Sequence, residues 1–572
     1  MKTKIVFAML LFIIISVNVC NAAILHVPDD YSTIQAAINA ADSGDIVLLE
    51  SGTYSGSGNT NLSFTGKSLT IRSKHGPAFT TIDCKNNARA FDLYKLDPSE
   101  GRLEGISIIN GYDDYSGGAL SLIESSLIIT NCRFHNCMTE EYGGAIYARR
   151  CDPIIENSRF TECIADQGGA IFVKSSDFTI RNCVLKLNAA DEGGGLYIDS
   201  ECQGFAIDTS FQSNLTTVAG GGIMVKNASP ALVNVLIFDN VARMGGGIYS
   251  LSAYPEISTA WISGNQANHI GGGICCDDNS EIILTNSLIV LNQAKNGGGL
   301  TSASGSDLNI KNCTVTNNAS DIQGGGIYCT LADLTVENSI VWYNGGGNLI
   351  QGEGGSIECR YSDIQGGFAG EGNIDKEPRF VTGLRGTFYL SQKSAGQNVN
   401  SPCVDAGRNQ ASDTTFIGRI GIEKISDYST ASNETNDSGV ADMGYHYMVS
   451  LPAFRTQPNM PEAYFHPGDT CKLDLMIKNY SKHFNSALIF VALNIGTEFW
   501  FWDGWSQDID FVDDSLSWGE WERSILPPFT WPDTGDSSLD GIVFYSAVID
   551  PITSALLGSD PGLGMTSFGF GP

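Results

Sequence analysis

Four acidic residues recur at nearly equal intervals in the first half of the chain. Asp114, Glu140, Asp166 and Asp191 each stand shortly before a run of two or three glycines. Carboxylates stacked about 5 Å apart repel one another, and a bound cation relieves that repulsion. The row therefore predicts calcium binding, because Ca²⁺ takes several oxygen ligands. The alternative is a solvated turn edge whose charges discourage aggregation.

An aromatic residue follows most of the same glycine runs. Tyr147, Phe172, Tyr197 and Tyr249 each come one residue after an apolar position. Strand alternation turns these rings away from an interior row. We therefore expect an exposed strip on which sugar rings can stack. The competing interpretation is that aromatic contacts only stiffen an outer face.

A second aromatic cluster, FWFWDGW, spans residues 499–505. Its Trp502 and Trp505 predict a carbohydrate-binding surface, although core packing of a small β-domain also calls for bulky side chains. The sequence has no His near a GxSxG motif and no GxxxxGK[ST] motif, so it identifies neither Ser-His-Asp catalysis nor nucleotide binding.

The glycine runs define an internal repeat. Their last residues are 25 to 27 positions apart, at Gly118, Gly144, Gly169, Gly195, Gly222, Gly247, Gly273, Gly299 and Gly326. Between them lie short segments of alternating polarity without helical periodicity, which indicates β-strands. A period of about 26 residues with about three strands fits one coil of a parallel β-helix, because a propeller blade needs more residues.

Two series of asparagines keep the same period. The first is Asn131, Asn157, Asn182, Asn234, Asn286, Asn312 and Asn338, and the second is Asn188, Asn214, Asn240, Asn265, Asn292, Asn318 and Asn344. An Asn in a left-handed turn can bond the amide of its counterpart one coil away. Apolar ladders should fill the interior, for example Ile223, Ile248, Ile274, Leu300 and Ile327.

The two ends of the rod need different segments. A short helix with a Ser32–Gln35 capping box and an apolar face of Ile34, Ala37, Ile38 and Ala41 should close the first coil. From there to about residue 365 we expect roughly twelve coils, a rod of about 60 Å.

Two resemblances support this fold. The opening VPDDYSTIQAAINAADSGDIVLLESGTYSG resembles the start of secreted proteins of the pectin-lyase-like superfamily, which implies a right-handed parallel β-helix. The repeats GGAL (117–120), GGAI (143–146) and GGAI (168–171) resemble the polymorphic outer-membrane protein family, whose terminal membrane barrel we do not expect here. The resemblance leaves activity open, because this fold hosts lyases, hydrolases, adhesins and stalks.

We expect four regions. Residues 1–22 are predicted to be a signal peptide, because Lys2 and Lys4 precede an apolar run before small residues. The all-β remainder divides into a parallel β-helix with its capping helix (23–365), a closing segment with a polar insert (366–450) and a Trp-rich β-sandwich (451–572). Most of the 15 cysteines should be small buried residues, since their spacing is irregular.

Composition limits the partners. The chain has 33 basic and 63 acidic residues, a formal net charge of −30, which repels nucleic acid and anionic lipid. Beyond the predicted signal peptide, no stretch is long and apolar enough to span a bilayer. We expect a secreted or cell-surface protein that binds an extracellular polysaccharide or cell-surface glycan, without identified catalysis. The alternatives are a calcium-dependent polysaccharide lyase or glycoside hydrolase, and a passive structural stalk.

Overall fold

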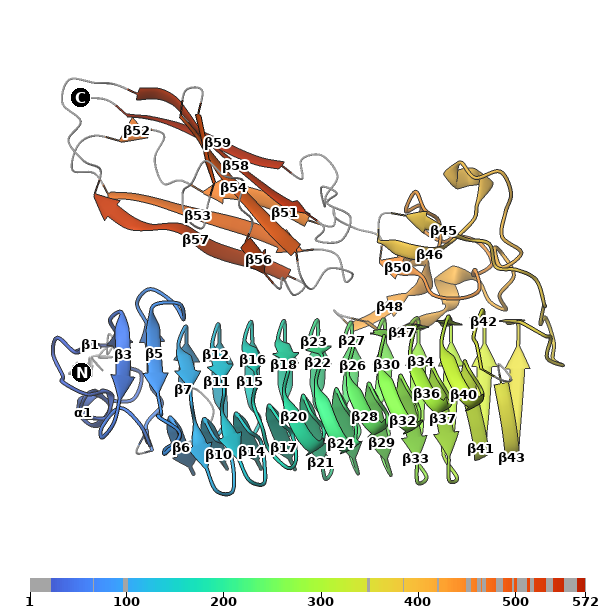
Figure 1. Ribbon diagram of the computed structural model, residues 1–572, viewed down its shortest axis with the longest axis horizontal. Helices are drawn as coiled ribbons and strands as arrows, with labels where there is room; N and C mark the ends of the chain where they lie inside the picture. The colour runs from blue at the N-terminus through green and yellow to red at the C-terminus, as the bar shows by residue number, and fades with distance from the viewer. Residues whose placement is uncertain are drawn as a thin grey trace, which may run out of the picture.

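A computed structural model describes residues 22–64, 66–95, 101–346, 350–383, 385–418 and 421–448, and only the strands between 454 and 570. Its main body is a rod of stacked coils with α1 at the first end (Figure 1). Every strand pair within this rod is parallel. The predicted parallel β-helix is therefore confirmed.

A typical coil has four strands. In the coil that begins at Leu215 they are β24 (Leu215–Ala219), β25 (Ile223–Lys226), β26 (Ala231–Val233) and β27 (Leu236–Phe238). Strands β25 and β26 belong to a 23-stranded sheet, β27 to a 13-stranded sheet and β24 to a six-stranded sheet. The 13-stranded sheet gives one coil more than expected. The strand before the glycines, β24, is a fourth segment that the sequence did not predict.

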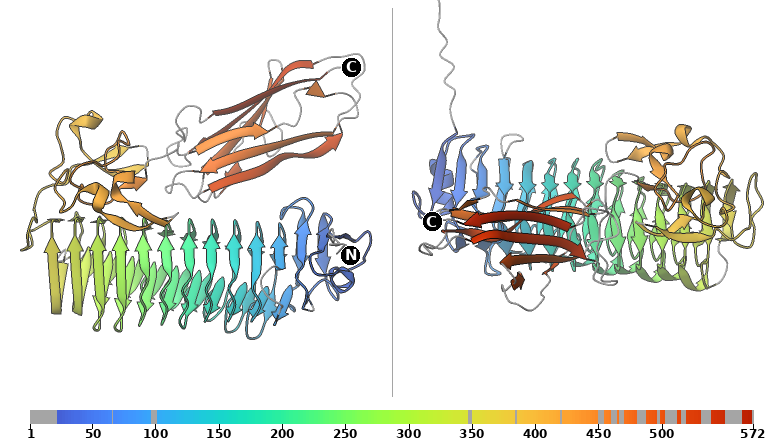
Figure 2. Two further views of the ribbon diagram at one scale, coloured as in Figure 1. Left: turned by 180° about the vertical axis from the view of Figure 1, so that it is seen from behind. Right: turned by 90° about the horizontal axis from the view of Figure 1, so that it is seen from above.

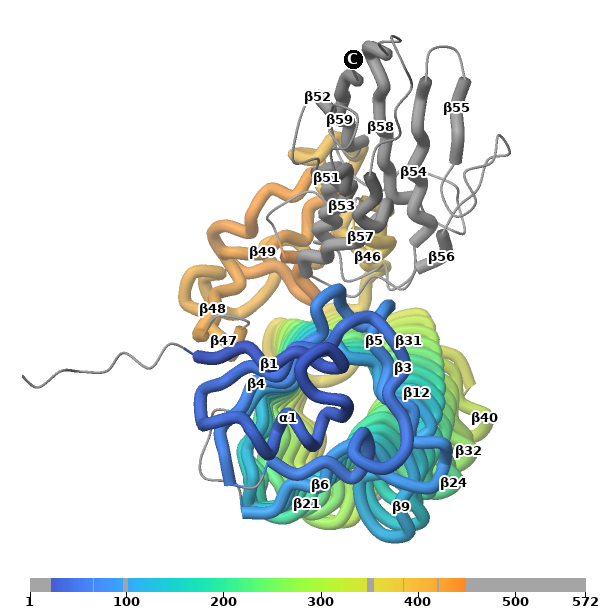
Figure 3. The backbone as a smooth tube through the Cα atoms, turned by 90° about the vertical axis from the view of Figure 1, so that its left-hand side faces the viewer, coloured from blue at the N-terminus to red at the C-terminus, as the bar shows by residue number. Residues whose placement is uncertain are grey.

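Strands equivalent to β25 follow each glycine run. They are β10 (Leu120–Ile123), β14 (Ile146–Arg149), β17 (Ile171–Lys174), β21 (Leu196–Asp199), β29 (Ile248–Leu251), β33 (Ile274–Asp277), β37 (Leu300–Ala303) and β41 (Ile327–Glu337). Strands equivalent to β24 are β9 (Tyr112–Asp113), β13 (Met138–Thr139), β20 (Ala189–Glu192), β28 (Val241–Met244), β32 (Gln266–Ile270), β36 (Gln293–Asn296) and β40 (Ala319–Gln323). Viewed end-on, this second group forms a ridge along one side of the rod (Figure 3).

The glycines allow a corner and a close approach between coils. Gly220, the first of its run, has φ +65°, a left-handed conformation that glycine adopts without a steric penalty. A Cβ on the next residue, Gly221, would lie 2.3 Å from the carbonyl oxygen of Gly246 in the following coil. The glycine repeat is therefore architectural, as the sequence predicted.

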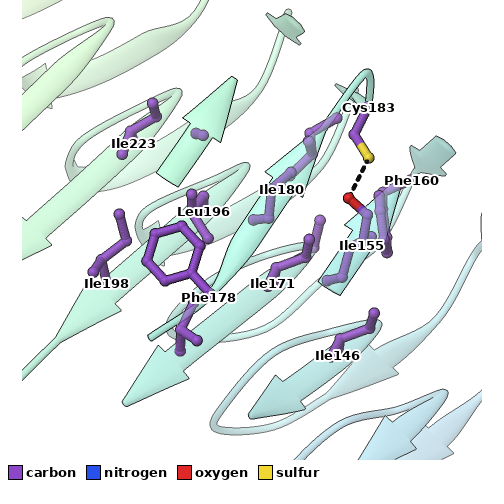
Figure 4. Packing of buried hydrophobic residues seen from close by; sticks show 14 of the residues in the cluster. Ile146, Ile155, Phe160, Ile171, Phe178, Ile180, Cys183, Leu196, Ile198 and Ile223 are labelled. Carbon is purple, nitrogen blue, oxygen red and sulfur yellow. Dashed lines mark hydrogen bonds between the residues drawn. The ribbon is translucent and has the colours of Figure 1, made fainter. Parts of the chain in front are cut away.

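The interior is a continuous apolar column. Ile223, Ile248 and Ile274 pair in register on successive coils and are fully buried, so the predicted ladder is confirmed. Part of this column is shown in Figure 4, where the Cys183 thiol donates to the Ile155 carbonyl oxygen at 3.5 Å. The thirteen cysteines among the described residues are all buried with free thiols, which confirms that they pack as small core residues.

The two asparagine series differ in backbone conformation. Asn240, of the second series, donates from Nδ2 to Asn265 Oδ1 at 2.9 Å and accepts from Asn214 Nδ2 at 2.9 Å. Residues of the first series, such as Asn286 and Asn338, hold positive φ at a turn.

The sequence assigned left-handed geometry and amide bonding to one residue. Asn157 and Asn182 of the first series combine the two, since Asn182 Nδ2 donates to Asn157 Oδ1 at 3.3 Å. The second series forms the longer ladder without the left-handed backbone.

Helix α1 (Ile34–Ala40) covers the first coil, as predicted. Ile34, Ala37 and Ile38 are buried against the column. The N-cap is Thr33, whose hydroxyl oxygen accepts a hydrogen bond from the Ala36 amide at 3.3 Å. The expected cap at Ser32 is wrong by one residue.

The segment after the last coil folds back along the flank of the rod (Figure 2). It contains three antiparallel pairs: β45 (Phe380–Gly383) with β46 (Gly386–Leu390), β47 (Thr415–Gly418) with β48 (Gly421–Lys424), and β49 (Tyr428–Ser429) with β50 (Tyr447–Met448). Tyr389 and Tyr447 stack with ring centroids 3.9 Å apart and pack on Leu288 and Val290 of β35 (Leu288–Val290).

Two sheets form the C-terminal region. One holds β51 (Phe454–Asn459), β53 (Thr470–Asn479) and β57 (Gly519–Thr530), and its strands are antiparallel. The other holds β52 (Tyr464–Phe465), β59 (Leu563–Phe570), β58 (Leu539–Ile549), β54 (Ala487–Ile495), β55 (Glu498–Phe501) and β56 (Val512–Asp514). Strand β51 contacts β58 and β59, so the sheets meet as the predicted β-sandwich.

Candidate functional site

The acidic row lies on the ridge in front of the glycines. Asp114, Glu140, Asp166 and Asp191 are all exposed. Strand pairing places them at equivalent positions on four consecutive coils, and the next two positions are Thr217 and Arg243. The structure therefore aligns these residues as the sequence predicted.

Two carboxylates of the row accept hydrogen bonds from neighbouring hydroxyl groups. Asp114 Oδ1 accepts a hydrogen bond from the Tyr112 hydroxyl at 2.9 Å, and Asp191 accepts one from the Thr217 hydroxyl. Within the part of the chain that the structure describes, no three His, Cys, Asp or Glu side chains gather as metal ligands. The carboxylates of the row are not gathered around one point as ligands of a single ion. Calcium binding by the row stays a prediction.

The predicted exposure of the aromatic row is wrong. Tyr147 is 7% exposed, Phe172 and Tyr197 are each 1% exposed, and Tyr249 is 5% exposed. The rings do point away from the interior column, but the ridge folds over them. Its apolar side chains cover the rings, namely Tyr142, Val218, Met244 and Ile270. We call this buried outer layer the tyrosine seam.

Stacking within the tyrosine seam is close. Phe172 lies between Tyr147 and Tyr197, with centroid distances of 5.6 Å and 5.1 Å. Tyr142 of the ridge lies 4.9 Å from the Phe172 ring. Aromatic pairs at such distances contribute beyond their buried area. The rings therefore hold the ridge against the sheet, and their buried faces cannot stack on a sugar.

Several predictions concern residues outside the described set. Trp502 and Trp505 lie there, and so do residues 1–21 of the predicted signal peptide. Carbohydrate binding by the tryptophans and export by the leader stay predictions. Among the described residues, none of the helices is both long and apolar enough to cross a bilayer.

A row of charged residues borders the seam two positions beyond the aromatic row. Strand register aligns Arg149, Lys174, Asp199 and Lys226 on four successive coils. We call these four residues the charged row. Repeated residue types do not reveal these four residues, because their types and charges change from coil to coil. The feature that could have identified them is their constant position, since each is the last residue of a strand that follows a glycine run.

The charged row interacts with the seam beneath it. Lys174 Nζ lies 2.6 Å from Asp199 Oδ2, and the side chains are 41% and 12% exposed. The hydrogen bond to Asp199 raises the pKa of Lys174. Burial raises the pKa of the Tyr147 hydroxyl, while nearby Arg149 and Lys174 oppose that rise. Cations, a carboxylate and a phenol thus share one patch.

The same face continues on neighbouring coils. The Tyr249 hydroxyl donates to Asp277 Oδ2 at 2.8 Å, and Gln167 Nε2 donates to Glu192 Oε2 at 3.1 Å. Burial, followed by the charges of Glu192 and Asp199, raises the pKa of Tyr197. Ionisable groups with shifted pKa values are typical of functional sites, although structural ion-pair networks also shift them.

Comparisons with known proteins give the fold. Residues 46–216 and 195–364 match the family model of the right-handed β-helix region. No curated protein sequence matches the chain. A mannuronic-acid-specific polysaccharide family 6 lyase from human gut microbiota is 12% identical, with TM-score 0.33, over 63% of this chain and 92% of its own. The enzymatically active domain of bacteriophage CBA120 tailspike protein 2 is 10% identical, with TM-score 0.24, over 94% of this chain and 76% of its own.

Proposed function

The chain belongs to the right-handed β-helix family, and from that premise we propose that it is an exported protein that binds an extracellular glycan. The binding surface is the charged row together with the hydroxyl groups at the edge of the tyrosine seam. The observation that carries the proposal is the alignment of Arg149, Lys174, Asp199 and Lys226 on four successive coils.

The chemistry of the row suits a sugar polymer. Arginine and lysine donate charge-assisted hydrogen bonds to hydroxyl and carboxylate oxygens, and the carboxylate accepts them from hydroxyl groups. Coils repeat about every 4.8 Å, so a linear ligand with its own repeat meets similar partners along the rod. The buried rings beneath the row fix its side chains and so reduce the entropy lost on binding.

Export is the second part of the proposal. Its support is the N-terminal sequence, in which Lys2 and Lys4 precede an apolar run in the order of a secretory signal. Detection of the mature protein outside the cytoplasm, with a new N-terminus near residue 23, tests this part. Retention of residues 1–22 in the cytoplasm contradicts it.

A binding measurement tests the surface. We expect the full chain to bind an acidic or neutral polysaccharide in calorimetry, and Lys174→Ala to weaken that binding by roughly tenfold, about 1.4 kcal/mol. Lys311→Ala is the matched control, because Lys311 is exposed on β38 (Asp307–Lys311) away from the row. Equal affinity of both variants contradicts the assigned surface, and no retention on any polysaccharide favours a passive stalk.

A polysaccharide lyase is the second candidate. One observation favours it, namely that strand register aligns Arg149 with Lys174 on adjacent coils, two residues beyond Tyr147. Elimination from a uronic acid needs a base, a proton donor and a cation near the carboxylate, and this patch holds groups of each type. Ultraviolet absorbance of unsaturated products from polygalacturonate, with and without Ca²⁺, tests it; no product rules out this activity on that substrate.

A further inference from the structure

A depression of about 500 Å³ lies across three successive turns. Its walls are Glu201, Gln203, Asn227, Ser229, Ser252 and Tyr254. These turns join β21 to β22 (Phe205–Ile207), β25 to β26, and β29 to β30 (Glu256–Ser258). The depression therefore begins directly after the strands that carry Asp199 and Lys226 of the charged row.

The depression combines an aromatic ring with polar groups. Tyr254 is 54% exposed, whereas Tyr197 and Tyr249 of the seam are buried. Within the described residues, the structure gives no hydrogen bond to the side chains of Gln203, Asn227 or Ser229. Their donors and acceptors face solvent and are available to a ligand.

The backbone beneath these side chains is fixed. The Tyr254 amide donates to the Ala228 carbonyl oxygen at 2.9 Å, and the Ser229 amide donates to the Cys202 carbonyl oxygen at 3.0 Å. Pro255 and Pro230 follow these two residues, and proline restricts the backbone of its own residue and of the one before. A preformed surface loses little conformational entropy when a ligand binds.

We infer that this depression binds one uncharged sugar residue of a glycan. The exposed face of Tyr254 packs on the apolar face of the sugar ring, because tyrosine offers rigid amphipathic contact area. The Gln203 and Asn227 amides and the Ser229 hydroxyl can both donate to and accept from sugar hydroxyls. Hydrogen-bond recognition of this kind needs no charge on the ligand.

The charge of the depression selects against acidic sugars. Glu201 is the one acidic residue of its walls and no basic residue lines them. The whole chain has a formal net charge of −30, so a uronate carboxylate is repelled. The charged row, one strand away, offers cations instead. This inference rests on the proposed function, since it gives a glycan-binding surface a second subsite for a different sugar type.

Crystals or calorimetry with neutral β-1,4-linked hexasaccharides of glucose, xylose and mannose test the inference on the full chain. We expect at least one of them to bind, Tyr254→Ala to weaken that binding by roughly tenfold, and Tyr254→Phe to retain it. Gln203→Ala should weaken it by a smaller factor. Tyr94→Ala is the matched control, because Tyr94 is 61% exposed on β6 (Phe91–Tyr94) at a different part of the rod.

The outcomes separate the two sites. Neutral-sugar binding lost in Tyr254→Ala but kept in Lys174→Ala supports a distinct subsite. Binding that Tyr254→Ala leaves unchanged overturns the inference, and so does binding of polygalacturonate alone, although the proposed function then stands. Absence of binding to neutral and acidic glycans alike overturns both.

Discussion

Asn286 holds the backbone of His446 by two hydrogen bonds. Its Oδ1 accepts from the His446 amide at 2.7 Å, and its Nδ2 donates to the His446 carbonyl oxygen at 3.1 Å. Both residues are fully buried. The side chain of a turn residue in the rod thus bonds both backbone groups of His446, as the backbone of a neighbouring strand would. This contact anchors residues 380–448 to the flank of the rod.

Asn286→Ala should release this anchor. Two buried backbone groups of His446 would lose their partners, which costs about 2–4 kcal/mol. Hydrogen exchange should rise at residues 428–448 before the rod itself opens. Asn131→Ala is the control, since Asn131 has the same left-handed turn conformation but is exposed. Equal effects in both variants would show that the cost is backbone strain alone.

Asn240→Ala should destabilise the rod more than a surface change. Beyond its ladder bonds, Asn240 Nδ2 donates to the Phe211 carbonyl oxygen at 3.0 Å, and its Oδ1 accepts from the Asn214 amide at 2.9 Å. We expect the free energy of unfolding to fall by on the order of 4 kcal/mol, measured by denaturant titration. Asn268→Ala, at an exposed position of β32 whose φ lies outside the left-handed region, should change it by a few tenths of a kcal/mol.

Gly221→Ala tests the close approach between coils. Its φ lies outside the left-handed region, so the expected loss of about 3 kcal/mol comes from the clash with the Gly246 carbonyl oxygen. A Cβ on Gly345 would meet no atom within 4 Å. Thermal unfolding should separate the two variants, and a similar melting temperature for both would refute the packing argument.

Asp363 should make the stability depend on pH. Burial raises its pKa to about 6, although hydrogen bonds from the Lys376 amide and the Cys403 thiol oppose the shift. Because the unfolded pKa is about 3.9, the folded state binds more protons between about pH 4 and pH 6. The stability contribution of this group therefore falls as pH rises through that window.

The matching variant is Asp363→Asn, which removes the titration. The free energy of unfolding of the variant minus that of the wild type should increase by about 2 kcal/mol from pH 4 to pH 7. Denaturant titration at several pH values measures this difference. Asp307→Asn, at an exposed carboxylate, provides the reference. Parallel pH profiles for Asp363→Asn and the wild type would contradict the assignment.

The sequence was sufficient for the repeat but not for what covers it. Ile223 and Ile248 were predictable interior residues because burial inside a solenoid follows from alternation and period alone. The exposure of Tyr197 was not predictable in this way. The exposed fraction of this side chain depends on the ridge, which the strand before each glycine run forms. A row of aromatic residues in the sequence does not reveal whether a neighbouring segment covers that row.

Two further features had no local signal. The charged row combines Arg149, Lys174 and Asp199, so a search for repeated residue types passes over it even though the position is constant. The contact between Asn286 and His446 joins residues 160 positions apart. No periodicity links them, since the closing segment has lost the repeat.

The ladder contacts have a consequence for the length of the rod. Leu215 pairs with Val241, and Asn214 bonds Asn240 in the way that Asn240 bonds Asn265. Removal of residues 215–240 would therefore join two compatible coils and shorten the rod by about 4.8 Å, with the asparagine ladder continuous across the junction. The same removal would align Asp191 with Arg243 in place of Thr217, so that an acidic and a basic side chain of the ridge would become neighbours on adjacent coils. Deletion of one coil thus changes the length of the rod and the order of charges along the ridge together. An unchanged melting profile of the deletion variant would show that the rod tolerates both changes.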